Sequence, residues 1–560
     1  MKYKKFKLSS LFIFLNIIIL FSSLLFIEEI YKLQFTDSEY FKSKALSNRQ
    51  KVDVIDAKRG SILDRNFNEV SETVNAFNIG IYPNKLEDKK IVAELLAPLL
   101  QTDKTKIYEK LNNNKNYFYL HRNVDFDVGS KIKSWNYQGI NVEKSSKRII
   151  YSDSLKKIIG FVDPDGNGIE GLELYFDNSL KGTDGELRYE AAPNGDFIPQ
   201  AGSSILDPIH GEDLVLSIDS ELQYISENLC SDAIKATQAF KCSVVFVNSE
   251  NGEIIISAEK SSTDNKYFNI NLISGRALYE PGSALKIFTV GSLLESNKVT
   301  ENDIFYIEDK IEIIEDSCDK NYEGLKGCFR DFLNHDPYEL SVKEIIERSS
   351  NVGTIKITEA SNVSEIENYL MKYGFSEKTG VELTGETSGG FIDYKRCLTC
   401  LSSLSIGYSV QVSQYQMVRA YSIIANGGSD VKLTLIQKDD IEVDNKTIIS
   451  SEMANRLKKL LINVVEGTNG TGKSLRKEGY IIGGKTGTSR THLEGIGYSE
   501  DRFNTSFTGF VETKDGPIVG SVLLWGAKTN QTSEYVTGGS TAAPIFKKII
   551  SYFVPKAPKE

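Results

Sequence analysis

The chain has 560 residues, of which 40% are hydrophobic, with 43 glycines, 12 prolines and a formal net charge of −10. This composition is typical of globular protein in about three domains. The negative balance, with no basic block outside the N-terminus, argues against nucleic acid as a partner. Four histidines, at 121, 210, 335 and 492, show no metal-ligand spacing. We expect each to be a surface residue, and we expect neither a histidine metal site nor a serine–histidine–aspartate triad.

The N-terminal segment predicts a membrane anchor. Four lysines precede an apolar run from Leu11 to Ile27, which as a helix spans roughly 26 Å, enough for the hydrocarbon of a bilayer. A cleaved signal peptide is the alternative, but the run ends in Leu-Leu-Phe-Ile-Glu-Glu without the small residues of a cleavage site. The basic flank predicts a cytoplasmic tail (1–9), a single transmembrane helix (10–27) and export of the rest of the chain.

Two modules are predicted beyond a helical stalk at 28–44. Residues 45–205 predict an α+β module, in which strand-like pieces such as "FNIGIYP" and "GELRYEAA" alternate with polar helices. A turn-rich stretch at 194–214 closes this module. The second module, 206–555, opens with a strand and an amphipathic helix. It contains two hairpin signals, an Asn-Gly turn within 241–259 and an Asp-Gly turn within 504–526.

Residues 467–490, "GTNGTGKSLRKEGYIIGGKTGTSR", carry two motifs of different chemistry. Gly467 to Ser474 fits the phosphate-binding loop, and Lys485-Thr486-Gly487 fits the K-T-G of enzymes that acylate a serine. A phosphate-binding loop follows a strand and opens a helix, whereas a helical pattern precedes Gly467 and a strand-like run follows Ser474. We therefore predict a glycine-rich surface turn and no bound nucleotide.

The K-T-G has two companions in the second module. Ser283-Ala-Leu-Lys286 is an S-x-x-K, and Ser349-Ser-Asn351 is an S-x-N. Each alone is a weak signal. The three in this order, with gaps of 63 and 134 residues and a strand hairpin after the last, are specific for acyl-serine enzymes.

These residue types fit serine acylation. Pro281-Gly282 makes a turn that places Ser283 in the first turn of a helix, whose N-terminus favours developing negative charge. Lys286 lies on the same helical face and accepts the serine proton only as a neutral amine. Burial or a nearby cation must therefore lower its pKa, and Lys485 is the expected cation.

The remaining motif residues are expected to handle the substrate. Ser349 is suited to relay a proton to the leaving amine and Asn351 to hold a substrate amide. The K-T-G strand is expected to offer its edge to an extended peptide, with Lys485, Thr486 and Thr488 facing a carboxylate and Gly487 beside them. The backbone N–H groups of Ser283 and Thr488 are expected to form the oxyanion hole.

The motifs and their flanks resemble the class B penicillin-binding proteins. "YEPGSALK" (279–286) is similar to the family's Y-E-P-G-S-T-F-K, while "RSSNVGTIKI" (348–357) and "GGKTGTSR" (483–490) match closely. "RGSILDRN" (59–66) and "GFVDPDGNGIEGLELYFDNSLKG" (160–182) resemble segments of the family's pedestal domain. Departures at Ser409 and Ser413-Gln414 fall beside the motifs and put only fine substrate preference in doubt.

The resemblance implies an α+β fold with one transmembrane helix, a dimerisation-type pedestal and a penicillin-binding transpeptidase domain, an antiparallel sheet flanked by helices. It implies that Ser283 attacks a D-Ala-D-Ala stem peptide of lipid-linked nascent glycan, releases the terminal D-Ala and passes the acyl group to a neighbouring amine. It also implies acylation by β-lactam antibiotics and no cofactor or metal. A serine β-lactamase and a non-catalytic sensor or scaffold are the alternatives.

Two segments indicate the pathway. Residues 165–182 and 407–428 are more similar to the division-type than to the elongation-type group. The resemblance therefore implies septal peptidoglycan synthesis, with a SEDS-family glycosyltransferase of the FtsW type and other division proteins as partners. Elongation of the side wall is the alternative.

All six cysteines lie in the second module, on the predicted oxidising side of the membrane. Cys318 and Cys328 flank the polar "DKNYEGLKG", so we predict a disulfide between them. Cys397 and Cys400 form a second local pair, for which disulfides or free thiols are favoured over zinc. The sequence assigns no partner to Cys230 or Cys242.

Overall fold

The computed structural model describes residues 3–191, 204–262, 274–320, 323–393, 397–438, 446–493, 495–528 and 536–554. Its contacts separate two compact units, 1–59 with 181–212, and 60–180 with 213–560. Residues 194–203 of the predicted turn-rich stretch lie outside the described residues. The predicted module boundaries stay a prediction. The α+β fold class is confirmed.

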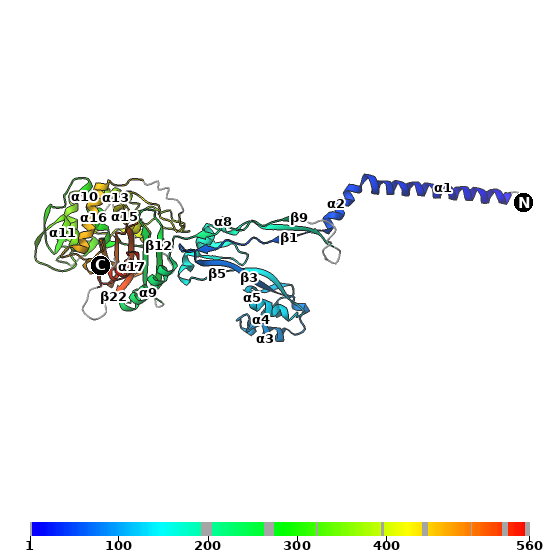
Figure 1. Cartoon of the computed structure of the whole chain (residues 1–560), viewed down its shortest axis with the longest axis horizontal. Helices are drawn as coiled ribbons and strands as arrows, with labels where there is room; N and C mark the ends of the chain where they lie inside the picture. Colours follow the sequence, from blue (N-terminus) through cyan, green and yellow to red (C-terminus); the bar gives the residue numbers. More distant parts are fainter. Residues whose placement is uncertain are drawn as a thin grey trace. The chain divides into compact units, whose positions relative to one another are not determined.

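The first unit contains the apolar N-terminal helix. Helix α1 (Tyr3–Tyr31), the π-helix η1 (Lys32–Thr36) and α2 (Ser38–Arg49) follow one another, so the predicted stalk is helical (Figure 1). Ser10–Thr36 contains an 18-residue window with a mean hydropathy of 2.6, and in the part of the chain that the structure describes it is the one helical stretch long and apolar enough to cross a membrane. A three-stranded antiparallel sheet completes the unit: β1 (Gln50–Ile55), β8 (Gly185–Glu190) and β9 (Ser204–Leu206).

The second unit begins with a five-stranded sheet, in which β5 pairs β3 and the other strands follow the order β10-β2-β3-β4. Asp88 and Asp103 cap α3 and α4 by accepting backbone N–H groups, and these helices pack with α5 on β3 and β4. The strands are β2 (Ile62–Leu63), β3 (Glu69–Ile81), β4 (Phe118–Asp125), β5 (Ile140–Ile150) and β10 (Leu214–Val215). The helices are α3 (Lys89–Leu96), α4 (Lys104–Asn113) and α5 (Phe126–Ser134).

Short elements lie between the strands of this sheet along the chain. They are η2 (Pro83–Lys85), η3 (Asp153–Leu155), α6 (Lys156–Ile159), β6 (Phe161–Val162), β7 (Gly168–Glu170), α7 (Gly171–Tyr175) and α8 (Asp177–Lys181). Buried Arg148 pairs with buried Glu173 at 2.7 Å, which fixes α7 against β5.

A second five-stranded antiparallel sheet, in the order β12-β11-β22-β21-β20, forms the centre of the remaining chain. Both predicted hairpins are confirmed, with Gly252 and Gly516 at positive φ in their turns. Strand β20 is last in this order, so one edge of the K-T-G strand pairs with no other described strand, as predicted. The strands are β11 (Lys241–Asn248), β12 (Ile254–Ser261), β20 (Ile482–Leu493), β21 (Gly497–Val511) and β22 (Ile518–Lys528).

Helices cover both faces of this sheet. Val244 and Phe246 of β11 share a core with α9 (Ser220–Thr237) and α17 (Ala542–Phe553). Their neighbours Val245 and Val247 share the opposite core with α10 (Lys286–Glu295), α15 (Gln414–Ala425) and α16 (Ser451–Glu466). The two cores sandwich the sheet between helical layers.

Shorter elements complete the part of the chain around this sheet. They are β13 (Leu278–Tyr279), η4 (Gly282–Leu285), β14 (Ile304–Ile307), β15 (Lys310–Glu312), η5 (Gly324–Lys326), β16 (Cys328–Arg330), β17 (Tyr338–Ser341), α11 (Val342–Arg348), α12 (Asn351–Thr358), α13 (Val363–Lys372), β18 (Gly390–Phe391), α14 (Cys400–Ser405), β19 (Val410–Ser413) and η6 (Lys473–Leu475).

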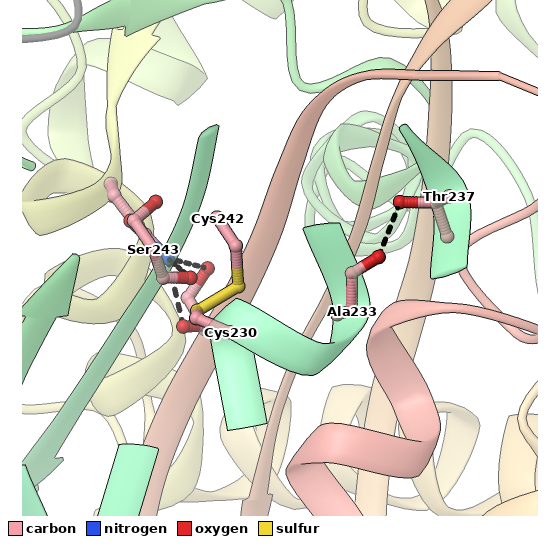
Figure 2. The surroundings of a disulfide bond; sticks show 7 residues. Cys230, Ala233, Thr237, Cys242 and Ser243 are labelled. Carbon is pink, nitrogen blue, oxygen red and sulfur yellow. Dashed lines mark hydrogen bonds between the residues drawn. A yellow bond between two sulfur atoms is a disulfide. The ribbon is translucent and has the colours of Figure 1, made fainter. Parts of the chain in front are cut away.

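The six cysteines form three disulfides. The predicted Cys318–Cys328 bond is confirmed, and the local pair Cys397–Cys400 is a disulfide rather than a zinc site. The two cysteines left without a partner by the sequence join α9 to β11, as Cys230–Cys242 (Figure 2). Helix α9 ends a few residues further on, where the Thr237 hydroxyl donates to the Ala233 carbonyl at 2.7 Å.

Candidate active site

Ser283 lies in a 3-10 turn, η4, that leads directly into α10. Gly282 before it has φ +55°, and a Cβ there would lie 2.9 Å from the Thr488 carbonyl, so only glycine fits between the turn and the K-T-G strand. The Gly282 N–H donates to the Gly407 carbonyl at 3.0 Å, and the Tyr421 hydroxyl donates to the Ala284 carbonyl at 2.7 Å. Ser283 is therefore held by its neighbours, and its own hydroxyl makes no hydrogen bond among the described residues.

Lys286 is fully buried one turn after Ser283. Its amine donates to the Ser349 carbonyl at 2.6 Å and to Asn351 Oδ1 at 2.7 Å. Burial lowers the pKa of Lys286 to about 7, against a smaller opposing effect of the Asp331 charge. A substantial fraction of the amine is therefore neutral near pH 7.

The S-x-N motif lies in the turn between two short helices. Helix α11 ends before Ser349, whose φ of +64° reverses the chain, and Ser350 caps α12 by accepting the Gly353 N–H at 2.8 Å. Asn351 uses both ends of its amide within the protein, since its NH₂ donates to the Arg330 carbonyl at 2.8 Å. The contacts of Asn351 thus favour holding Lys286 over holding a substrate amide.

Lys485 is also fully buried and faces the same turn. Its amine donates to Ser349 Oγ at 2.7 Å and to the Thr486 carbonyl at 3.3 Å. Burial lowers the pKa of Lys485 well below its usual value, and the charge of Lys286 lowers it further. The two lysines are close enough for the charge of Lys286 to act on Lys485, but the predicted effect of Lys485 on Lys286 is absent, since burial is the one cause that lowers the pKa of Lys286.

The rest of the K-T-G strand runs close to the Ser283 turn. A Cβ on Gly487 would lie 2.8 Å from the Pro281 carbonyl, and the Ser489 hydroxyl donates to the Glu280 carbonyl at 2.9 Å. Thr488 is half-buried, and its hydroxyl accepts the Gly538 N–H at 3.3 Å. The Thr486 hydroxyl donates to Thr471 Oγ1 at 2.8 Å, so without substrate it is directed to the glycine-rich turn.

The glycine-rich turn at 467–474 has a structural role that its phosphate-loop pattern does not indicate. It follows α16 and precedes β20, which confirms the predicted helix-then-strand order. The buried Glu347 carboxylate accepts the Asn469 N–H and the Asn463 amide, both at 2.7 Å, and the Glu347 carbonyl accepts the Thr471 N–H at 3.3 Å. The turn thereby ties the end of α11 to Thr486 of β20.

One histidine prediction was wrong. His121, His210 and His492 are exposed, but the His335 side chain is only 16% exposed. Its Nε2 lies 3.2 Å from Asp331 Oδ2, and its ring stacks on Tyr338 with centroids 4.3 Å apart. Sequence spacing missed this pair because neither residue belongs to a motif. Within the described ranges, no cluster of three or more histidine, cysteine, aspartate or glutamate side chains is arranged to hold a metal ion.

The structure therefore brings together Ser283, Lys286, Ser349, Asn351 and Lys485, with Thr486, Gly487 and Thr488 along one edge. Ser283 supplies a half-buried hydroxyl one turn before the buried Lys286 amine, whose pKa is lowered, and the Ser349 hydroxyl binds the Lys485 amine. This arrangement can support acyl transfer through a serine.

Residues 242–551 match the model of the penicillin binding protein transpeptidase domain, and residues 54–216 match that of the penicillin-binding protein dimerisation domain. The chain therefore belongs to the class B penicillin-binding proteins, the peptidoglycan D,D-transpeptidases that carry both domains. This confirms the family that the motifs indicated.

Named relatives and solved structures agree with this membership. Stage V sporulation protein D of Bacillus subtilis is 27% identical over 549 residues, covering 93% of this chain and 82% of the relative. Peptidoglycan D,D-transpeptidase FtsI of Buchnera aphidicola is 27% identical over 510 residues, covering 88% and 85%. The fold is similar to that of penicillin-binding protein 2 in its complex with MreC from Helicobacter pylori, with a TM-score of 0.72, 19% identity and coverage of 90% and 99%.

Proposed function

We propose that Ser283 is the nucleophile and Lys286 its general base. A neutral amine has two N–H donors and one lone pair. Because the Ser349 carbonyl and Asn351 Oδ1 accept two hydrogen bonds from Lys286, the lone pair of the neutral amine stays available for the serine proton. The proposal rests on this observation: Lys286 is buried, and both N–H donors of its neutral amine are used by the protein.

The proposed reaction has two half-reactions. Ser283 Oγ bonds to the penultimate carbonyl of a D-Ala-D-Ala stem peptide while its proton passes to Lys286. The backbone N–H groups of Ser283 and Thr488 stabilise the oxyanion. Ser349, held by Lys485, relays the proton that Lys286 took up to the departing D-Ala amine, so that Lys286 is neutral again for the second half-reaction. A neighbouring stem-peptide amine then attacks the acyl-enzyme and restores the serine hydroxyl.

The proposed substrate site is the free edge of β20. An extended peptide would pair with this edge, as in strand addition, with its carboxylate at Lys485, Thr486 and Thr488 and its backbone against Gly487. Thr486 would then donate to the carboxylate and accept a hydrogen bond from the Thr471 hydroxyl, which keeps Thr486 in place. β-Lactam antibiotics are proposed to occupy the same position and acylate Ser283.

Covalent labelling tests the catalytic assignment. The full-length protein should be labelled by a fluorescent penicillin, and Ser283→Ala should remove the label. Ser451→Ala, at an exposed serine that begins α16, is the matched control and should label normally. Undiminished labelling of Ser283→Ala would refute the assignment, and rapid loss of label from the wild type would indicate a β-lactamase.

The cellular role is proposed to be septal synthesis at division. The support is the similarity of 165–182 and 407–428 to division-type sequences, since both pathways use the same three motifs. A membrane-embedded glycosyltransferase of the FtsW type is the proposed partner. Depletion should give filaments with unfinished septa, whereas round, swollen cells that still divide would assign the protein to elongation.

The apolar helix α1 is proposed to anchor the protein with the N-terminus in the cytoplasm and the catalytic domain outside. Four lysines before the apolar run support this orientation. Protease added to intact spheroplasts should digest the catalytic domain. Protection of that domain until the cells are lysed would contradict the orientation.

A further inference from the structure

We infer that Asp331 is a positioning residue for the transpeptidase reaction, holding the S-x-N turn in place and presenting a negative charge to Lys286. The inference rests on the proposed roles of Ser283 and Lys286. It concerns a residue outside the three motifs, in the segment between β16 and β17.

The Asp331 carboxylate binds the first turn of α12. One oxygen accepts the backbone N–H of Asn351 and, at 3.0 Å, that of Val352. The other accepts the Ser350 hydroxyl at 2.8 Å. The side chain is only 8% exposed, so these charge-assisted bonds are formed largely out of water. They fix the residues that follow Ser349, whose left-handed backbone is an uncommon conformation for serine.

The residue before Asp331 orients the Asn351 amide. The Arg330 carbonyl accepts the NH₂ of Asn351, so the amide oxygen must face Lys286. The Arg330 carbonyl therefore binds the side chain of Asn351, and the Asp331 carboxylate binds its backbone. A shift of this segment would move the acceptor that directs the Lys286 lone pair.

The charge of Asp331 opposes the effect of burial on one of two buried amines, Lys286. Lys286 from α10 and Lys485 from β20 are both driven towards the neutral form by burial. Asp331 acts in the opposite sense, because its negative charge raises the pKa of Lys286. Around Asp331 lie His335 in the same segment, Tyr338 of β17, whose pKa its charge also raises, and Arg348 of α11 over the Tyr338 ring.

Substitutions at Asp331 separate geometry from charge. Asp331→Asn keeps the size and one oxygen but removes the charge, whereas Asp331→Glu keeps the charge and displaces it. Asp336→Asn, an exposed aspartate five residues later, removes the same charge away from the turn and is the matched control. The rate constant for acylation of each full-length variant by fluorescent penicillin is measured from pH 5.5 to 9.

We expect Asp331→Asn to move the midpoint of the acid limb to lower pH, because removing a negative charge lowers the pKa of Lys286. We also expect its plateau rate to fall about tenfold or more, as for loss of a charge-assisted hydrogen bond. Asp331→Glu should lose rate while its midpoint stays near that of the wild type. Asp336→Asn should match the wild type in both.

The folding of Asp331→Asn is checked by thermal melting. If the folded variant shows no shift in the midpoint of its pH–rate curve, the proposed effect of the Asp331 charge on Lys286 is wrong. If Asp331→Asn does not fold, Asp331→Glu still tests the proposal. A wild-type acylation rate in Asp331→Glu would show that Asp331 does not position the S-x-N turn. Failure of the proposed function looks different, because label would survive Ser283→Ala in an otherwise unchanged protein.

Discussion

The Lys286 amine donates a 2.6 Å hydrogen bond to the main-chain carbonyl of Ser349, a residue 63 positions later whose own hydroxyl binds Lys485. The proposed base is thus oriented by the backbone of the proposed proton relay. Because a main-chain carbonyl cannot rotate as a side chain does, the relay and the base keep a fixed relation to each other.

The rate of acylation should depend on pH through Lys286. Its pKa of about 7 means that the reactive neutral amine is lost as pH falls below that value. We expect the acylation rate constant to fall about tenfold per pH unit well below pH 7 and to level off above it. Stopped-flow labelling with a fluorescent penicillin measures this curve, and a flat rate from pH 5 to 9 would argue against a lysine base.

Replacing Lys286 should be nearly as damaging as replacing Ser283. Lys286→Ala removes the base, and Lys286→Arg keeps a cation that does not deprotonate at these pH values. We expect both to slow acylation by about 10²–10⁴-fold. Lys343→Ala, at an exposed lysine of α11, is the control and should label like the wild type. Rapid labelling of Lys286→Arg would show that a neutral amine is not required.

Gly407→Ala should damage the site through backbone contact. Its φ is +86°, and a Cβ would lie 2.0 Å from the Gly282 carbonyl, so the Ser283 turn must move. We expect a loss of more than about 1 kcal/mol in the free energy of unfolding and slower acylation. Gly427→Ala shares the positive φ of +90° but has open space, so it should cost stability without slowing acylation. Equal effects of the two on acylation would contradict the contact argument.

The glycine-rich turn should matter through Thr471 and not through Lys473. Thr471→Val removes the acceptor of the Thr486 hydroxyl, and we expect slower acylation by about tenfold. Lys473→Ala should leave acylation intact, and the wild type should not bind ATP in calorimetric titration. ATP binding that Lys473→Ala abolishes would restore the phosphate-loop interpretation.

Mass spectrometry of the unreduced protein should show three linked cysteine pairs, 230 with 242, 318 with 328, and 397 with 400. Each pair lies close in sequence, so proteolysis should release them as separate linked peptides. Alkylation of Cys318 and Cys328 without prior reduction would contradict the bond between them.

Motif chemistry predicted most of the site, because S-x-x-K, S-x-N and K-T-G each specify a side chain with one role. Turn chemistry likewise predicted both hairpins from their Asn-Gly and Asp-Gly pairs. Asp331 and Glu347 were not predicted, because they act by accepting backbone N–H groups of residues that are distant in the sequence and come close only after folding. The partner of Cys230 was missed for a related reason, since its bond depends on how α9 packs on β11.

The tight contact between the Ser283 turn and β20 also has a consequence for self-association. An unpaired strand commonly invites another copy of the same chain to pair with it. Here the Ser283 turn lies against the backbone of β20 at Thr488, whose carbonyl would be 2.9 Å from a Cβ on Gly282, so the turn limits the length of β20 available for pairing. A few residues of a stem peptide, or the compact ring system of a β-lactam, suit such a gap, whereas a full strand from a second molecule would collide with the turn that bears the serine.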